Sequence, residues 1–390
     1  MPRGFLFSAV EAAIKKPGRK DLALIYSERE CIASGMFTTN SVKAAPVRLD
    51  MKRIRPGKGR AIIVNSGNAN ACTGVRGMED ACEMSESVAG TLRVKASGVY
   101  VCSTGVIGAP MPMERIRPKI PELVRNLGKF SLDDAAAAIM TTDTFPKTAG
   151  RSIRVNGKTV NIAGMCKGAG MIRPDMATML CFLLTDASIG KGALDKALRA
   201  AVGKSFNRIT VDGDMSTNDT VLIMANGMAG NATIREMTPA FDAFAAALSS
   251  ITYELSAMIV RDGEGATKFV EVEVRNARSD KEAEKGARAI ADSLLVKTAL
   301  CGSDANWGRI IAALGYSGIT IKEESTDIFL NGIKVAGRGT ATGRDKEANE
   351  RLKGKEVRIV ADLHLGKGCA KILTCDLTEA YVKINAEYRT

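Results

Sequence analysis

The stretch SIRVNGKTVNI at residues 152–162 decides the fold class, because it predicts two short strands joined by a tight turn. Asn-Gly between alternating apolar residues is the strongest short-range signal for a two-residue hairpin. A second stretch with the same pattern, IFLNGIKV, follows at 328–335. Hairpins make neighbouring strands antiparallel, so we do not expect a doubly wound parallel sheet.

Helical and strand patterns surround these two hairpins. Apolar residues recur at spacings of three and four in 191–205, 239–260 and 279–295, and the last range begins with a capping-box signature, Ser279 and Glu282. Strands are expected at 98–103, 177–184, 220–225, 268–274, 356–365 and 370–377. This mixture predicts a layered α/β fold with mixed sheets. We place a domain boundary near residue 275, between a main region at 1–275 and a smaller α/β domain at 276–390.

The composition is that of a globular protein with a basic surplus. The chain has 390 residues, 45% of them hydrophobic, and a formal net charge of +12. That surplus indicates either a solvated basic surface or attraction of an acidic partner. Aromatic residues make up only 5%, and Lys and Arg are scattered. Nucleic-acid binding is therefore disfavoured, and a small acidic substrate fits the charge better.

The nine cysteines include no C-x-x-C pair, and most have apolar neighbours. This usage is typical of reduced thiols in a cytosolic protein. The N-terminal apolar run is short and broken by Glu11, and no apolar stretch approaches the ~18 residues of a membrane span. We expect a cytoplasmic protein that does not enter a membrane.

The available chemistry is restricted by the single histidine, His364, in the alternating stretch VRIVADLHL. One histidine excludes a His-x-x-x-His metal site, and a Ser-His-Asp triad would have to use this residue, which we interpret as structural. There is no P-loop, and the glycines of GMCKGAG at 164–170 do not match a dinucleotide fingerprint. We expect neither a metal nor a bound cofactor.

A nucleophile that needs no histidine is an N-terminal threonine, whose own α-amine acts as the base. The pKa of an α-amine is about 7.7–8.0, which suits proton transfer near neutral pH. An internal threonine has no such amine until the chain is cut in front of it. Small residues next to the bond favour self-cleavage, because the backbone must bend there. The segment KGAGMIRPDMATML at 167–180 meets this description.

Several unusual strings, in one order from end to end, resemble the ornithine acetyltransferase family, which is also known as glutamate N-acetyltransferase. The resemblance implies an N-terminal-nucleophile-like sandwich of mixed sheets flanked by helices. It also implies self-cleavage between Ala177 and Thr178, giving chains 1–177 and 178–390 in a tetramer of two α and two β chains. The strings are KGAG…MATML above, IKKPGRKDLAL at 14–24, VNSGNANACTG at 64–74, MTTDTFPK at 140–147, TVDGDMSTNDT at 210–220, RDGEGATK at 261–268, GSDANWGRI at 302–310 and KINAEYRT at 383–390.

The resemblance also assigns roles to residues. Thr178 becomes the nucleophile, and the Thr104 hydroxyl and the Gly105 N–H form the oxyanion hole. The implied reaction carries an acetyl group from N2-acetyl-L-ornithine to L-glutamate through acetyl-Thr178, with acetyl-CoA as a possible second donor. The implied substrate contacts are Thr144, Lys167, Thr178, Glu264, Asn385 and Thr390.

The chain departs from the family pattern at Arg173, Asp175 and Met215, and the first two lie close enough to Thr178 to alter the cleavage rate. Two alternatives stay open. One is an N-terminal-nucleophile aminopeptidase or amidase of the same broad fold, which would release its acyl group to water. The other is a basic binding protein that is never cleaved.

Overall fold

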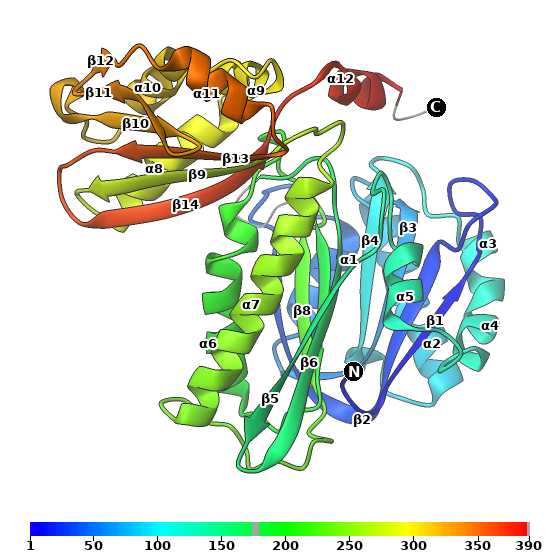
Figure 1. The fold of residues 1–390 in the computed structure, drawn as a ribbon. Helices are drawn as coiled ribbons and strands as arrows, with labels where there is room; N and C mark the ends of the chain where they lie inside the picture. The colour runs from blue at the N-terminus through cyan, green and yellow to red at the C-terminus, as the bar shows by residue number, and fades with distance from the viewer. Residues whose placement is uncertain (174–178, 388–390) are drawn as a thin grey trace. The chain divides into compact units, whose positions relative to one another are not determined.

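The computed structural model describes residues 1–173 and 179–387. Contacts divide the chain into two compact units, one formed by 1–207 and 214–259 and the other by 208–213 and 260–390 (Figure 1). The sequence placed the boundary near residue 275. The difference arises because the strand over 268–274, expected to end the first region, is the inner strand β9 of the second unit's sheet.

Both predicted hairpins form with two-residue turns. Strands β5 (Lys147–Val155) and β6 (Lys158–Lys167) pair antiparallel, and Asn156 and Gly157 have φ of 47° and 76°. Strands β10 (Asp327–Leu330) and β11 (Ile333–Gly337) repeat this arrangement around Asn331 and Gly332. Two successive positive φ values are those of the type I′ turn, whose twist matches that of the flanking strands.

The sheet of the first unit has the described strand order β4-β3-β2-β8-β7-β6-β5, with β1 also paired to β2. Strand β2 joins its two halves, since its first part pairs with β3 and its last part with β8, and the register is interrupted between Tyr26 and Cys31. The strands other than the hairpin are β1 (Phe5–Val10), β2 (Leu22–Phe37), β3 (Lys58–Asn68), β4 (Val99–Val106), β7 (Leu180–Thr185) and β8 (Thr220–Ala225).

The two half-sheets pack face to face and carry helices on their outer faces. One buried cluster contains Ile62 and Tyr100 from the β3–β4 half together with Phe182 and Leu222 from the β7–β8 half. Helix α2 (Gly74–Leu92) packs on the outer face of β3 and β4, while α6 (Lys191–Gly203) and α7 (Pro239–Arg261) cover the other half (Figure 1). This confirms the expected sandwich of mixed sheets flanked by helices. The unit also contains α1 (Ala45–Arg53), α3 (Met113–Ile116), α4 (Ile120–Arg125) and α5 (Leu132–Ala138).

The second unit has one mixed sheet in the described order β12-β11-β10-β13-β9-β14. The strand expected at 268–274 forms as β9, and every second residue, Val270, Val272 and Val274, is fully buried in the core of this unit. The other strands are β9 (Phe269–Ala277), β12 (Thr340–Ala341), β13 (Glu356–Asp362) and β14 (Gly368–Cys375). The helices are α8 (Asp280–Asp292), α9 (Leu294–Cys301), α10 (Trp307–Tyr316), α11 (Asp345–Leu352) and α12 (Glu379–Ala386).

The single helix expected over 279–295 is wrong in one respect, because Ser293 divides it into α8 and α9. Ser279 caps α8 by accepting a hydrogen bond from the Glu282 N–H at 3.2 Å. Ser293 has extended backbone angles, and its hydroxyl accepts from the Val296 N–H to cap α9. A serine used as an N-cap ends the preceding helix even though the apolar spacing continues through it.

Helix α7 corrects the expectation that no apolar stretch approaches the length of a membrane span. By length and composition this helix could span a membrane, although 56% of its most apolar window is buried inside the structure, as in a core helix.

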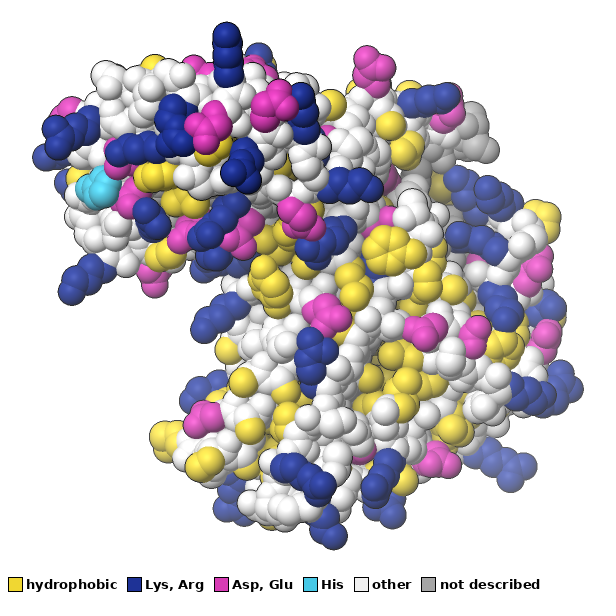
Figure 2. Space-filling model, in the orientation of Figure 1, with side chains coloured by type: hydrophobic (Ala, Val, Ile, Leu, Met, Phe, Trp, Pro, Cys, Tyr) yellow, Lys and Arg dark blue, Asp and Glu magenta, His cyan; other side chains and the backbone are white. Residues whose placement is uncertain are grey.

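Figure 2 shows Lys and Arg side chains spread over the visible face with Asp and Glu among them. This distribution agrees with the scattered basic charge of the sequence.

Candidate active site

The tripeptide Ser103-Thr104-Gly105, in which the oxyanion hole was predicted, lies in the last part of strand β4, one residue before its end at Val106. Gly105 has a φ of +137° and is paired with Gly67 of β3. A Cβ on Gly105 would lie 2.2 Å from the carbonyl carbon of Gly67, so no other residue fits. The strand end therefore presents backbone without a side chain, as a backbone donor to an oxyanion requires.

Lys167 at the end of β6 reaches the same tripeptide. Its Nζ donates a hydrogen bond to Thr104 Oγ1 at 3.3 Å, and both side chains are buried. Because the hydroxyl oxygen accepts this bond, the Thr104 O–H remains a donor for a further partner. The structure thus brings together Thr104, Gly105 and Lys167, which were predicted as separate oxyanion and substrate contacts.

A buried carboxylate, Asp143, holds the lysines of this site. Its Oδ1 accepts from Lys147 Nζ and from the Gly168 N–H, both at 2.7 Å, and its Oδ2 lies 4.0 Å from Lys167 Nζ. Burial alone would raise the pKa of Asp143, but the charges of Lys167 and Lys147 and the Gly168 N–H outweigh it and hold this pKa at about 2. The ammonium groups of Lys147 and Lys167 both lie within 4.0 Å of this carboxylate, and a lysine ammonium suits a substrate carboxylate.

Asp143 and Lys147 were not predicted as members of the site. Both lie in the string MTTDTFPK, from which only Thr144 was selected. Thr144 is exposed and follows the buried Asp143 directly in the chain. A lysine with 0% exposure is rare unless it is paired, but burial of that kind cannot be read from the residue type.

The nucleophile segment connects β6 to β7. These strands pair antiparallel with Lys167 opposite Leu180, so the intervening chain leaves and re-enters the sheet beside the Thr104 site. Met179 is described, and its N–H donates to Asp219 Oδ1 at 3.1 Å. The predicted nucleophile Thr178 and its neighbour Ala177 lie outside the described residues, as does Asp175.

Two further predicted substrate contacts, Glu264 and Asn385, meet within the second unit. Asn385 on α12 donates from Nδ2 to Glu264 Oε2 at 2.8 Å, and Glu264 is buried. The C-terminal segment is therefore helical through Ala386 instead of frayed. Thr390 lies outside the described residues.

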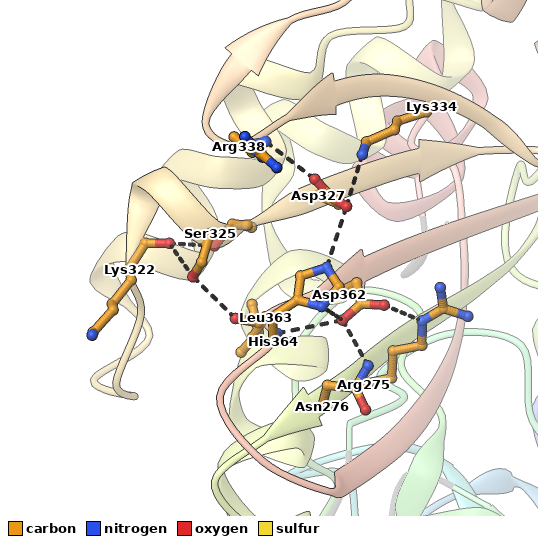
Figure 3. Close-up of polar contacts among 11 residues, drawn as sticks. Arg275, Asn276, Lys322, Ser325, Asp327, Lys334, Arg338, Asp362, Leu363 and His364 are labelled. Carbon is orange, nitrogen blue, oxygen red and sulfur yellow. Dashed lines mark hydrogen bonds and ion pairs between the residues drawn. The ribbon is translucent and has the colours of Figure 1, made fainter.

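His364 belongs to a separate polar cluster of the second unit (Figure 3). It was expected on a strand, but β13 ends at Asp362, and His364 follows in a turn with a φ of +52°. Its ring lies between two carboxylates, with Nε2 3.2 Å from Asp327 and Nδ1 3.5 Å from Asp362. These carboxylates also bind Lys334 and Arg275. The ring therefore belongs to a cluster of ion pairs that joins β9, β10, β11 and the end of β13, as a structural histidine does.

We predict that His364→Ala leaves the activity that the resemblance implies within about threefold of wild type. The ring is about half exposed, and ion pairs at such positions contribute about 1 kcal/mol or less. Steady-state kinetics of wild type and His364→Ala measure the activity, and urea unfolding measures the change in stability. A loss of activity larger than tenfold with normal folding would contradict the structural role of this histidine.

No group of three or more potential metal ligands occurs among residues 1–173 and 179–387. All nine cysteines are free, and those at the strand positions 31, 102, 166, 181 and 375 are buried. Among the described residues, the polar groups that meet near Gly105 are the Thr104 hydroxyl, the Lys167 ammonium, the Asp143 carboxylate and backbone amides. Backbone without a side chain, beside a hydroxyl and a buried lysine, is an arrangement suited to acyl transfer, in which negative charge develops on a carbonyl oxygen.

Comparison with known proteins agrees with this class. The model of the ArgJ family matches residues 6–390, and the chain belongs to that family. An arginine biosynthesis bifunctional protein ArgJ from Geobacter sulfurreducens is 55% identical, covering 100% of this chain and 99% of its own. The protein of the same name from Caldanaerobacter subterraneus is 51% identical, with 100% and 98% coverage. A solved structure of ArgJ from Bacillus halodurans is 48% identical with a TM-score of 0.51, covering 53% of this chain and 97% of that one.

Proposed function

We propose that this protein is a self-cleaving acetyltransferase of arginine biosynthesis that moves the acetyl group of N2-acetyl-L-ornithine to L-glutamate. The observation that carries the proposal is the contact between Lys167 and Thr104 beside Gly105, at the strand ends from which the Thr178 segment departs. Membership in the ArgJ family supports the same reaction.

The first step is cleavage of the chain. Thr178 Oγ attacks the carbonyl carbon of Ala177, and the C–N bond breaks, so that the peptide becomes an ester and the Thr178 nitrogen becomes a free amine. Water then hydrolyses the ester, which releases the Ala177 carboxylate and restores the Thr178 hydroxyl. The solved Bacillus chain supports this step, since nearly all of it aligns and yet it covers about half of the present chain. We propose chains 1–177 and 178–390, associated as two α and two β chains in the cytoplasm.

The second step is acetyl transfer. The Thr178 amine takes the proton from Oγ, Oγ attacks the acetyl carbonyl, and ornithine leaves with that proton on its nitrogen. The oxyanion accepts hydrogen bonds from the Thr104 hydroxyl and the Gly105 N–H, each worth roughly 3–4 kcal/mol in comparable sites. Lys167, whose Nζ already binds Thr104 Oγ1, polarises that hydroxyl and stabilises the developing negative charge.

The remaining contacts orient the two amino acids. Lys167 binds a substrate carboxylate, and the buried Glu264 binds a substrate ammonium, with Asn385 fixing the carboxylate oxygen of Glu264. Thr144 and Thr390 complete the proposed set. Glutamate then attacks the acetyl ester, so one amide replaces a similar amide and no ATP is needed. Acetyl-CoA is proposed as a further donor that acylates the same Thr178.

The reaction is tested by measuring ornithine release from acetylornithine with and without glutamate. We expect steady release only when glutamate is present, and a single turnover that leaves one acetyl group on the 178–390 chain when it is absent. Intact mass spectrometry detects both the cut chain and the acetyl group. Steady release at a comparable rate without glutamate would indicate an amidase, and one uncut, inactive species would indicate the binding protein.

A further inference from the structure

The tetrapeptide Thr217-Asn218-Asp219-Thr220 lies between Ser103, next to the proposed oxyanion hole, and Met179, next to the proposed nucleophile. It has no role in the mechanism proposed above. It leads into β8, which pairs in parallel with β7 so that Thr220 lies opposite Leu180. Asn218 and Asp219 are both buried. Polar side chains are buried only when their hydrogen bonds are made, so their partners reveal what they hold in place.

Asn218 binds the oxyanion strand. Its Nδ2 donates to the carbonyl oxygens of Ser103 at 2.8 Å and Ala69 at 2.6 Å. The amide has a fixed orientation, because the Thr217 hydroxyl donates to Asn218 Oδ1 at 2.6 Å and leaves Nδ2 for the two carbonyls. The Ser103 carbonyl belongs to the peptide that leads into Thr104. Asn218 therefore fixes the backbone immediately before the oxyanion hole.

Asp219 binds the other side of the site. Its Oδ1 accepts from the Met179 N–H at 3.1 Å, and the Thr220 N–H donates to the Met179 carbonyl at 3.0 Å. Both backbone groups of Met179 are thus held by two consecutive residues. The peptide group that contains the Met179 N–H also contains the carbonyl of Thr178, and a peptide group is planar. Asp219 and Thr220 therefore fix the residue that directly follows the proposed nucleophile.

We infer that Asn218 and Asp219 are positioning residues that fix the distance between Thr178 and the oxyanion hole, one holding Ser103 and the other Met179. The inference rests on the proposed role of Thr178. Asn218 binds Ser103 and Asp219 binds Met179, and these two residues are adjacent in the chain. The spacing between Ser103 and Met179 therefore depends on a short covalent link. A misplacement of about 1 Å between reacting groups can lower a rate about 10²-fold.

The hydrogen bond from Met179 to Asp219 does not require a charged carboxylate. Burial raises the pKa of Asp219 well above its ordinary value, against the Met179 N–H, the charge of Lys167 and the hydroxyls of Ser216 and Thr38, which lower it. A neutral carboxylic acid still accepts the Met179 hydrogen bond through its carbonyl oxygen. Asparagine has nearly the same shape and the same acceptor oxygen, so Asp219→Asn keeps the Met179 hydrogen bond.

The test compares Asp219→Ala, Asp219→Asn and Asn218→Ala with two matched controls. Asp186 follows the last residue of β7, is fully buried, and accepts from the Asn161 N–H at 2.7 Å. Asn231 is buried and bridges two carbonyls through Nδ2, as Asn218 does, but at Ser188 and Ala232. Asp186 also accepts from the Arg3 N–H and from Asn161 Nδ2, so its loss removes at least as many buried hydrogen bonds as the loss of Asp219. Asp186→Ala and Asn231→Ala therefore remove buried structural bonds away from Ser103 and Met179.

We expect Asp219→Ala and Asn218→Ala to slow cleavage of the precursor and to lower kcat about 10²-fold, with KM changed less than threefold. Asp219→Asn should recover most of the loss. The two control variants should show a similar drop in Tm but a kcat within threefold of wild type. Equal kcat losses in the controls, or wild-type cleavage and kcat in folded Asp219→Ala, would overturn the inference. Cleavage is measured without substrate, so a wild-type chain that is cut but transfers no acetyl group refutes only the proposed reaction.

Discussion

Replacing Thr178 with alanine is expected to leave the chain uncut and to lower acetyl transfer by on the order of 10⁴-fold or more, as when other covalent nucleophiles are removed. The alanine lacks the hydroxyl that attacks the Ala177 carbonyl, so no amine is released to act as the base. Intact mass spectrometry of the purified variant reports cleavage, and ornithine release with glutamate present reports transfer.

Two variants make this result interpretable. Thr178→Ser keeps a hydroxyl and should be cut and active, more slowly, whereas Thr159→Ala removes a threonine from the Asn156-Gly157 hairpin and should match wild type. The Thr178→Ala protein should also show wild-type Tm and circular dichroism. Full activity in an uncut Thr178→Ala chain would exclude the proposed nucleophile, whatever the fold of the protein.

The features that were predicted from the sequence are local ones. Asn156-Gly157 and Asn331-Gly332 specify their own turns, because positive φ at two successive residues is a property of those residues. Strand β8 was expected at 220–225 and lies at Thr220–Ala225. Such elements follow from a few neighbouring side chains, and tertiary packing does not override them here.

The features that were missed depend on contacts between distant residues. Strand β2 changes its partner from β3 to β8 partway along, and no local pattern marks that change. The site shows the same limit: Thr104 and Lys167 are 63 positions apart, and only the folded half-sheets bring them within 3.3 Å. The resemblance supplied both residues, but the structure supplied the contact between them.

Asp143 was also not predicted as a member of the site, and its replacement should have the largest effect on stability. Asp143→Asn should destabilise the first unit by about 3–5 kcal/mol, because it leaves Lys147 and Lys167 buried without their carboxylate. Glu122→Gln is the control, since Glu122 also pairs with a lysine but is about 39% exposed, and it should cost less than about 0.5 kcal/mol. Urea unfolding at neutral pH measures both.

The pH dependence of the unfolding free energy shows how much of the destabilisation by Asp143→Asn comes from the lost charge and how much from packing. The folded pKa of Asp143, about 2, is below the ordinary 3.8, so the stabilisation is present above about pH 4 and is lost as the pH falls toward 2. This difference in pKa corresponds to about 2 kcal/mol. The gap in unfolding free energy between wild type and Asp143→Asn should therefore narrow by about that amount between pH 5 and pH 2.

A gap that stays constant over this range would show that Asp143→Asn acts by packing alone. The double variant Asp143→Leu, Lys147→Met provides the complementary measurement, because it removes the carboxylate together with the lysine that it binds at 2.7 Å. Replacing a buried pair by apolar groups costs much less than breaking it. The double variant should therefore be more stable than Asp143→Asn yet poorly active, since Lys167 beside Thr104 loses the carboxylate that orients it.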